Sequence, residues 1–262
     1  MTSILERAEK VLADAKELLW PNSPPWVGFQ GWRDLLFVSW SLPIEKVRSV
    51  VPPQLELDSI DGRAWVSLVP MRVAGAHFRD VDPLPGLEHF CEINLRTYVK
   101  LGEERGVYFI SIDCADAIAD WLGQKLFGAP FLRANIAMVE QDGKFYFLSR
   151  RTQSDMPTAN FVADFQPAGD AFPTSADPTA QFLLERYFLA LSDKDGSVHR
   201  VNIQHPAWSI RRAETKISVN TVCAAGRIAL SRPPDHAVYS AGTDTLIYPP
   251  VEIKQPVSTP KD

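Results

Sequence analysis

Residues 90–99 read FCEINLRTYV and carry ionisable side chains in a regular pattern. Apolar residues hold most of the odd positions, and the even positions hold Glu92, Asn94, Arg96 and Tyr98. Alternation with period two predicts a β-strand whose two faces have different surroundings. The polar face lies either towards water or towards a cavity, and in a cavity Glu92 and Arg96 would be site residues.

In a cavity, these residue types would suit a small organic acid. The planar fork of an arginine matches a carboxylate, and a glutamate can act as a general acid or base. His205 lies in the segment HPAW, where it either ends a strand anchored by Trp208 or belongs to the site. No metal site is expected, because His199 and His205 on one strand would lie about 20 Å apart.

The composition and the missing motifs restrict the class of function. The chain has 262 residues and a net charge of −5 without a basic run, so no nucleic-acid partner is expected. The glycine motifs of nucleotide sites, GxSxG and HExxH are absent, and no cofactor is expected. Three cysteines without a CxxC pair indicate a reducing compartment, the cytoplasm.

Residues 1–22 predict an amphipathic helix rather than a secretory signal. Charges occur throughout MTSILERAEKVLADAKELL, and Ser3 with Glu6 fits a capping box. Apolar residues recur with helical spacing at Leu5, Ala8, Leu12, Ala15 and Leu19. No run of about 20 apolar residues occurs, so no membrane span is expected.

The remaining residues, 23–262, are predicted to form one domain built mainly of β-hairpins. Turn signals separate pairs of strand-like runs at 61–62, 101–106, 142–143 and 195–196. Short helices are expected at 43–51 (capped by Ser41), 115–128 and 178–186, and a surface loop at 167–178. The predicted fold class is α+β and mostly antiparallel: a curved sheet or conical β-barrel with a few peripheral helices.

Five segments, in this order, resemble the acetoacetate decarboxylase-like superfamily and especially its YqjF-like branch. They are WRDLLFVSWSLPIEKVRSVVPPQLELD (32–58), RAWVSLVP (63–70), FCEINLRTYV (90–99), GQKLFGAPFLRANIAM (123–138) and IQHPAWS (203–209). The resemblance implies a curved antiparallel barrel or cone with helices outside, and a tendency to self-associate into a homo-oligomer.

The resemblance carries over only part of the decarboxylase site. Arg33 and Glu92 match a site arginine and a site glutamate, whereas a second glutamate falls at Val66. Phe131 and Leu132 stand where the decarboxylases have two adjacent lysines. A lysine made nucleophilic by a neighbouring cation is what forms a Schiff base with a ketone. The resemblance therefore implies that acetoacetate decarboxylase activity is absent.

If the family geometry holds, Glu92 and Arg96 meet Arg33 in a cavity, and an arginine keeps Glu92 ionised at neutral pH. Three possibilities remain open, and the third is a structural role with an empty, solvent-filled barrel. The first is binding of a small organic acid or ketone without catalysis, through Asn94, Arg96, Tyr98, Phe131, Leu132 and His205. The second is a lysine-independent enzyme of the lyase or hydrolase type, with Glu92 as general acid/base and Arg33 and Arg96 holding an anionic group.

Overall fold

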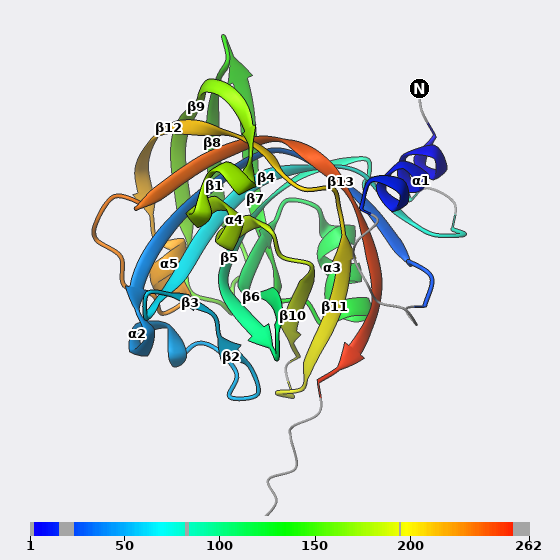
Figure 1. Ribbon diagram of the computed structural model, residues 1–262, viewed down its shortest axis with the longest axis horizontal. Helices are drawn as coiled ribbons and strands as arrows, with labels where there is room; N and C mark the ends of the chain where they lie inside the picture. The colour runs from blue at the N-terminus through cyan, green and yellow to red at the C-terminus, as the bar shows by residue number, and fades with distance from the viewer. Residues whose placement is uncertain (1–2, 16–23, 82–83, 194, 254–262) are drawn as a thin grey trace, which may run out of the picture.

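The computed structural model describes residues 3–15, 24–81, 84–193 and 195–253, which form one sheet of thirteen strands with few helices (Figure 1). The strands are β1 (Gly28–Pro43), β2 (Glu56–Leu57), β3 (Ser59–Ile60), β4 (Arg63–Phe78), β5 (His89–Leu101), β6 (Glu104–Cys114), β7 (Phe131–Gln141), β8 (Lys144–Arg151), β9 (Asn160–Pro173), β10 (Phe188–Ser192), β11 (Val198–Gln204), β12 (Ser209–Asn220) and β13 (His236–Glu252). The helices are α1 (Ile4–Asp14), α2 (Ile44–Arg48), α3 (Ala117–Phe127), α4 (Pro178–Leu184), α5 (Val222–Ala225) and a 3₁₀ turn at Thr174–Ala176.

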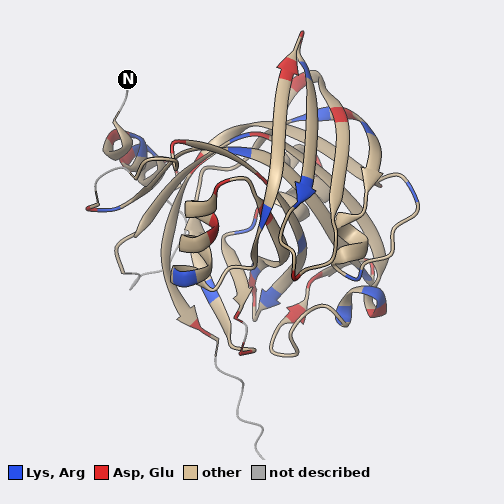
Figure 2. Cartoon of the chain, turned by 180° about the vertical axis from the view of Figure 1, so that it is seen from behind, with Lys and Arg blue, Asp and Glu red and all other residues tan. Residues whose placement is uncertain are grey.

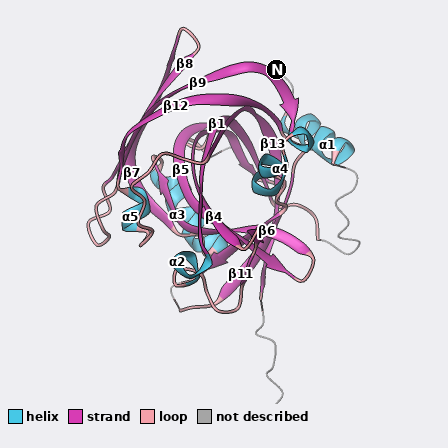
Figure 3. Ribbon diagram, turned by 60° about the vertical axis from the view of Figure 1, so that its left-hand side comes forward, coloured by secondary structure: helices cyan, strands magenta, loops and turns pink. Residues whose placement is uncertain are grey.

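The sheet closes on itself. Its order is β11-β10-β6-β7-β8-β9-β12-β13-β1-β4-β5-β2, and the further pairs β5–β6 and β11–β13 join distant parts of this path. Strands β1, β4, β5, β6, β10, β11 and β13 thereby form a hydrogen-bonded ring, part of the curved wall in Figure 3. Only β6–β10 and β6–β7 pair in parallel. The expected class, a curved and mostly antiparallel sheet with few helices, is confirmed.

Strands β1, β4 and β5 form a wall between two apolar cores. On β5, Ile93 and Leu95 belong to one core, which also contains Phe147 and Phe165. The opposite face of the wall meets the second core, which lies inside the seven-strand ring and includes Trp208. Because both faces are covered, the middle of β1 is a continuous apolar run from Leu35 to Val38.

The four expected hairpin turns are confirmed, since β3–β4, β5–β6, β7–β8 and β10–β11 pair antiparallel across them. The capping box of Ser3 and Glu6 is also present. The expected apolar face of the first helix is partly wrong: α1 buries Ala8 and Val11, whereas Leu5 and Leu12 are exposed. Positions 1–2 and 16–22 of this prediction lie outside the described residues.

Two local predictions are corrected. The expected loop at 167–178 is strand as far as Pro173, where β9 continues along β12 after its pairing with β8 has ended at Phe165. Proline fits there because a strand with one free edge needs no N–H on that side. The helix expected at 43–51 spans only Ile44–Arg48 and has no side-chain cap, so Ser41 does not cap it.

Lysine and arginine are interspersed with aspartate and glutamate over the elements seen from behind (Figure 2). In the described part of the chain, no helix is both long and apolar enough to cross a membrane.

Where β6 meets β10, adding one methyl group to the chain should lower the stability of the fold. A Cβ at Gly106 would lie 2.4 Å from the ring of Phe188, which is fully buried. Gly106→Ala should therefore lower the unfolding free energy by about 1–3 kcal/mol, measured by urea denaturation. Gly28→Ala is the matched control, because its Cβ would meet Ile247 at an ordinary 3.5 Å. Equal stability of the two variants would contradict the packing described for this junction.

Candidate functional site

The seven-strand ring encloses a pocket of about 130 Å³. Most of its lining is apolar and comes from the ring strands, from α3 and from the end of α4. Its polar lining residues are Gln30, Glu92, Asn94, Arg96, Arg186 and His205. A cavity near 150 Å³ can hold benzene, so this pocket has the size for a small organic molecule.

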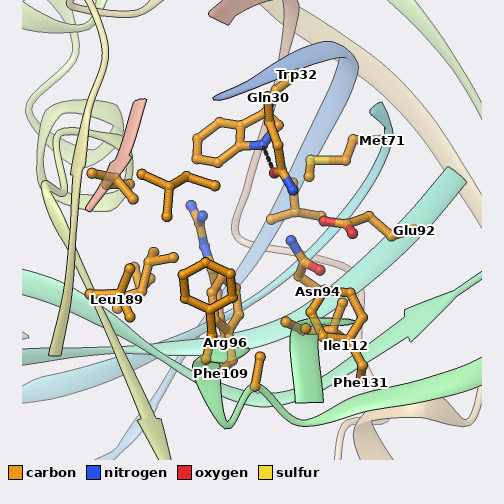
Figure 4. Close-up of a pocket in the computed structure, with 18 of the residues that line it drawn as sticks. Gln30, Trp32, Met71, Glu92, Asn94, Arg96, Phe109, Ile112, Phe131 and Leu189 are labelled. Carbon is orange, nitrogen blue, oxygen red and sulfur yellow. Dashed lines mark hydrogen bonds between the residues drawn. The ribbon is translucent and has the colours of Figure 1, made fainter. Parts of the chain in front are cut away.

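The structure brings together most of the residues expected from FCEINLRTYV. Glu92, Asn94 and Arg96 all point towards the pocket from β5 (Figure 4). Tyr98 does not line it: its side chain is fully buried, and its hydroxyl lies 2.5 Å from the Ser67 hydroxyl. The polar face of this strand therefore faces a cavity, as the family geometry implied.

Arg33 is not in this pocket. Its guanidinium binds the carboxylate of Asp244, which also accepts a 2.6 Å hydrogen bond from Arg7 on α1. A bulge at Asp34, where φ is 51°, explains the error, because it shifts the alternation of β1. Trp32 lines the pocket, and because neighbouring residues of a strand face opposite sides, Arg33 points away from the pocket. The expected meeting of Arg33 with Glu92 is therefore wrong.

Glu92 has no arginine partner among the described residues. Its side chain is only 5% exposed, and burial raises its pKa to about 7, while the Asn94 side-chain amide acts in the opposite direction. Arg96 lies four residues further along β5, about 13 Å between Cα atoms, and Figure 4 shows the two charges apart. The expectation of an arginine-held Glu92, fully ionised at neutral pH, is corrected.

Arg96 is held by weak contacts. Its Nη2 donates a 3.3 Å hydrogen bond to the carbonyl of Leu183, and its Cζ lies 5.3 Å from the centre of the Phe37 ring. Within the described ranges, no carboxylate lies within ion-pair distance of its guanidinium, and Nε has no hydrogen-bond partner. The charge is thus available to a molecule in the pocket.

Sequence reasoning missed Arg186. It lies between α4 and β10 and is 2% exposed. Its Nη1 donates a 2.6 Å hydrogen bond to the Asp58 carboxylate, and its Nε donates one of 2.6 Å to the Phe182 carbonyl. No pattern in the sequence marks it, because a single arginine in a connector is usually a surface residue.

His205 both anchors a strand end and lines the pocket. Its Nδ1 lies 2.8 Å from the Pro206 carbonyl oxygen, and its ring packs 5.1 Å from that of Trp208. Burial lowers its pKa. His205 therefore combines the two roles expected for it, at a strand end anchored by Trp208 and in the lining of the pocket.

Phe131 and Leu132 stand where the decarboxylases have two lysines. Phe131 lines the pocket and Leu132 does not. Phe131 packs against α3 where Gly123 lacks a side chain; a Cβ there would lie 2.4 Å from its ring. No lysine occurs among the described residues that line the pocket. The described residues hold no group of His, Cys, Asp and Glu that could bind a metal ion.

The ring-like sheet and its enclosed pocket define the acetoacetate decarboxylase-like fold. A structure described as "Structural Studies of Acetoacetate Decarboxylase" matches with a TM-score of 0.62 at 12% identity, over 90% of this chain and 93% of the other. The enduracididine biosynthesis enzyme MppR complexed with pyruvate matches with a TM-score of 0.61 at 14% identity, over 91% and 94%.

Within this class, the chain belongs to the DUF2071 family, described as "Uncharacterized conserved protein (COG2071)", whose model matches residues 29–244. YqjF of Bacillus subtilis (strain 168) is 32% identical over 224 residues, which are 86% of this chain and 91% of that protein. The family resemblance found in the sequence is confirmed.

The raised pKa of Glu92 makes stability depend on pH. Its carboxyl binds a proton more tightly in the folded chain, so its stabilising effect is complete below pH 4.5 and is lost as pH rises through about 7. Relative to Glu92→Gln, the wild type should lose about 2 kcal/mol of unfolding free energy between about pH 5.5 and 8.5.

Urea denaturation at several pH values measures this difference. Glu9→Gln on the exposed side of α1 removes one carboxyl from the surface and controls for the change in overall charge. A pH-independent difference between wild type and Glu92→Gln would show that Glu92 is solvated.

Proposed function

We propose that the pocket binds a small, partly apolar organic acid or ketone and does so without forming a Schiff base. The observation that carries this proposal is the guanidinium of Arg96, which lines a mostly apolar pocket and has no carboxylate partner in the described ranges. The Arg96 side chain is partly buried, and its Nε is fully buried. A partly desolvated cation without a counter-charge is unfavourable, and an anionic ligand would compensate for it.

Two further observations support a small acid. The pocket has room for a molecule of a few carbon atoms. The structurally similar enzyme MppR is complexed with pyruvate in its solved structure, and pyruvate combines a carboxylate with a ketone. Phe131 and the lack of a lining lysine among the described residues favour non-covalent binding. The family resemblance also favours a homo-oligomer, and the sparse cysteines favour the cytoplasm.

A second function, a lysine-independent lyase or hydrolase, is favoured by one observation. The pKa of Glu92 near 7 is suited to a general acid or base at neutral pH. In this alternative, Glu92 moves the proton and Arg96 holds the anionic group. Arg33 takes no part, because it is bound to Asp244 outside the pocket.

Binding predicts a thermal shift that depends on Arg96. Pyruvate should raise the melting temperature of the wild type, because a ligand that binds only the folded state stabilises it. Arg96→Gln should lose this shift. Arg150→Gln, which removes an exposed arginine on β8, should keep it. Differential scanning fluorimetry over a range of pyruvate concentrations measures the effect, and equal shifts in both variants would reject the role of Arg96.

Non-covalent binding predicts that no imine forms. After incubation with pyruvate and borohydride, the intact protein should keep its original mass. A stoichiometric adduct in the mass spectrum would overturn the proposal, because borohydride converts an imine between pyruvate and a lysine into a stable amine, whereas reduction of free pyruvate leaves the protein mass unchanged.

A further inference from the structure

Arg96 and Arg186 converge on one end of the pocket. Both donate to carbonyls at the end of α4, Arg96 to Leu183 at 3.3 Å and Arg186 to Phe182 at 2.6 Å. Their Cζ atoms lie 5.7 and 5.1 Å from the centre of the Tyr98 ring. These contacts place both guanidinium groups around the Tyr98 ring, and both residues line the pocket.

Each of these arginines has a buried N–H without a partner in the described part of the chain: Nε of Arg96 and Nη2 of Arg186. Asp58 pairs with Arg186 at 2.6 Å and also lies 3.7 Å from Arg105, whereas no carboxylate of the described residues lies within ion-pair distance of Arg96. A buried donor without an acceptor is unfavourable. A carboxylate can accept from both guanidinium groups and supplies the missing negative charge.

Further along β5, on the side of Glu92, the pocket offers both a hydrogen-bond acceptor and a donor. The Oδ1 atom of Asn94 is buried without a partner among the described residues. The Oε1 atom of Gln30 accepts from Trp32 Nε1 at 2.9 Å, and its amide nitrogen points towards Glu92 and Asn94 (Figure 4). A hydroxyl group donates and accepts, whereas a ketone only accepts and would leave Asn94 unpartnered.

We propose, building on the function proposed above, that the pocket selects a short hydroxycarboxylic acid. Its carboxylate binds Arg96 and Arg186, its hydroxyl binds Asn94 and Gln30, and its carbon chain packs on the apolar wall near Phe131. This assigns a binding role to Arg186 and a selective role to Asn94.

The test uses three acids of one skeleton: 4-hydroxypentanoate, 4-oxopentanoate and pentanoate. Isothermal titration calorimetry at neutral pH should give the hydroxy acid an affinity about 3- to 10-fold above that of the keto acid, as expected for one more hydrogen bond. Asn94→Leu should remove this preference and keep the affinity for pentanoate.

Arg186→Lys keeps the positive charge but removes the planar fork of the guanidinium, and it should lower the affinity for all three acids by about 10- to 100-fold. Arg151→Lys is the matched control, because Arg151 is equally buried and paired with Asp113 but does not line the pocket. It should leave all three affinities unchanged. Circular dichroism checks that both variants fold. If Arg186→Lys does not fold, the loss of the preference for the hydroxy acid in Asn94→Leu tests the inference.

The outcomes separate this inference from the proposed function. If the acids bind but the keto acid binds as well as the hydroxy acid, or folded Arg186→Lys binds like Arg151→Lys, the inference fails and the acid-binding pocket stands. If neither pyruvate nor any of the three acids binds the wild type, the proposed function itself fails.

Discussion

The wall formed by β1, β4 and β5 must bury both of its faces, and the pocket is a consequence of that constraint. On β4, Val66 and Leu68 pack into one core, while Val69 and Met71 face the other. Polar side chains on such a strand lose much of their contact with water, so a protein partner or a ligand stabilises them. On β5 the structure meets this need incompletely, since Asn94 Oδ1 and Arg96 Nε lack partners among the described residues.

Buried ion pairs elsewhere show how the same fold treats arginines that do not line the pocket. Arg151 is bound to Asp113 at 2.8 Å, and both side chains are fully buried. Paired in this way, the two charges compensate each other inside the protein and link β6 to β8. Arg96 differs because its contacts are a carbonyl and aromatic rings. The contrast supports a role in binding rather than in stability.

The sequence predicted what depends on local pattern. Alternation placed Glu92 and Arg96 on one face, and the dipeptides at 61–62 and 142–143 located two-residue turns. Prediction from the sequence failed where the position of a side chain depends on the geometry between strands and helices. The bulge at Asp34 turned Arg33 away from the pocket, and a positive φ at aspartate has no clear sequence signal. Arg186 was missed because only the closed ring brings its connector beside β5.

The pairing of Glu92 with Arg96 was predicted wrongly for a reason that bears on function. Sharing a face of a strand does not bring residues i and i+4 into contact, because each residue advances the chain by about 3.3 Å. Had the two met, the pocket would have satisfied its own charges, and a ligand would have had to break an ion pair to enter. Kept apart, Glu92 loses hydration, and with a pKa of about 7 its carboxyl is about half protonated at neutral pH. The guanidinium of Arg96, which has no carboxylate partner among the described residues, can then bind an anion, and the partial protonation of Glu92 weakens the repulsion between that anion and this carboxyl.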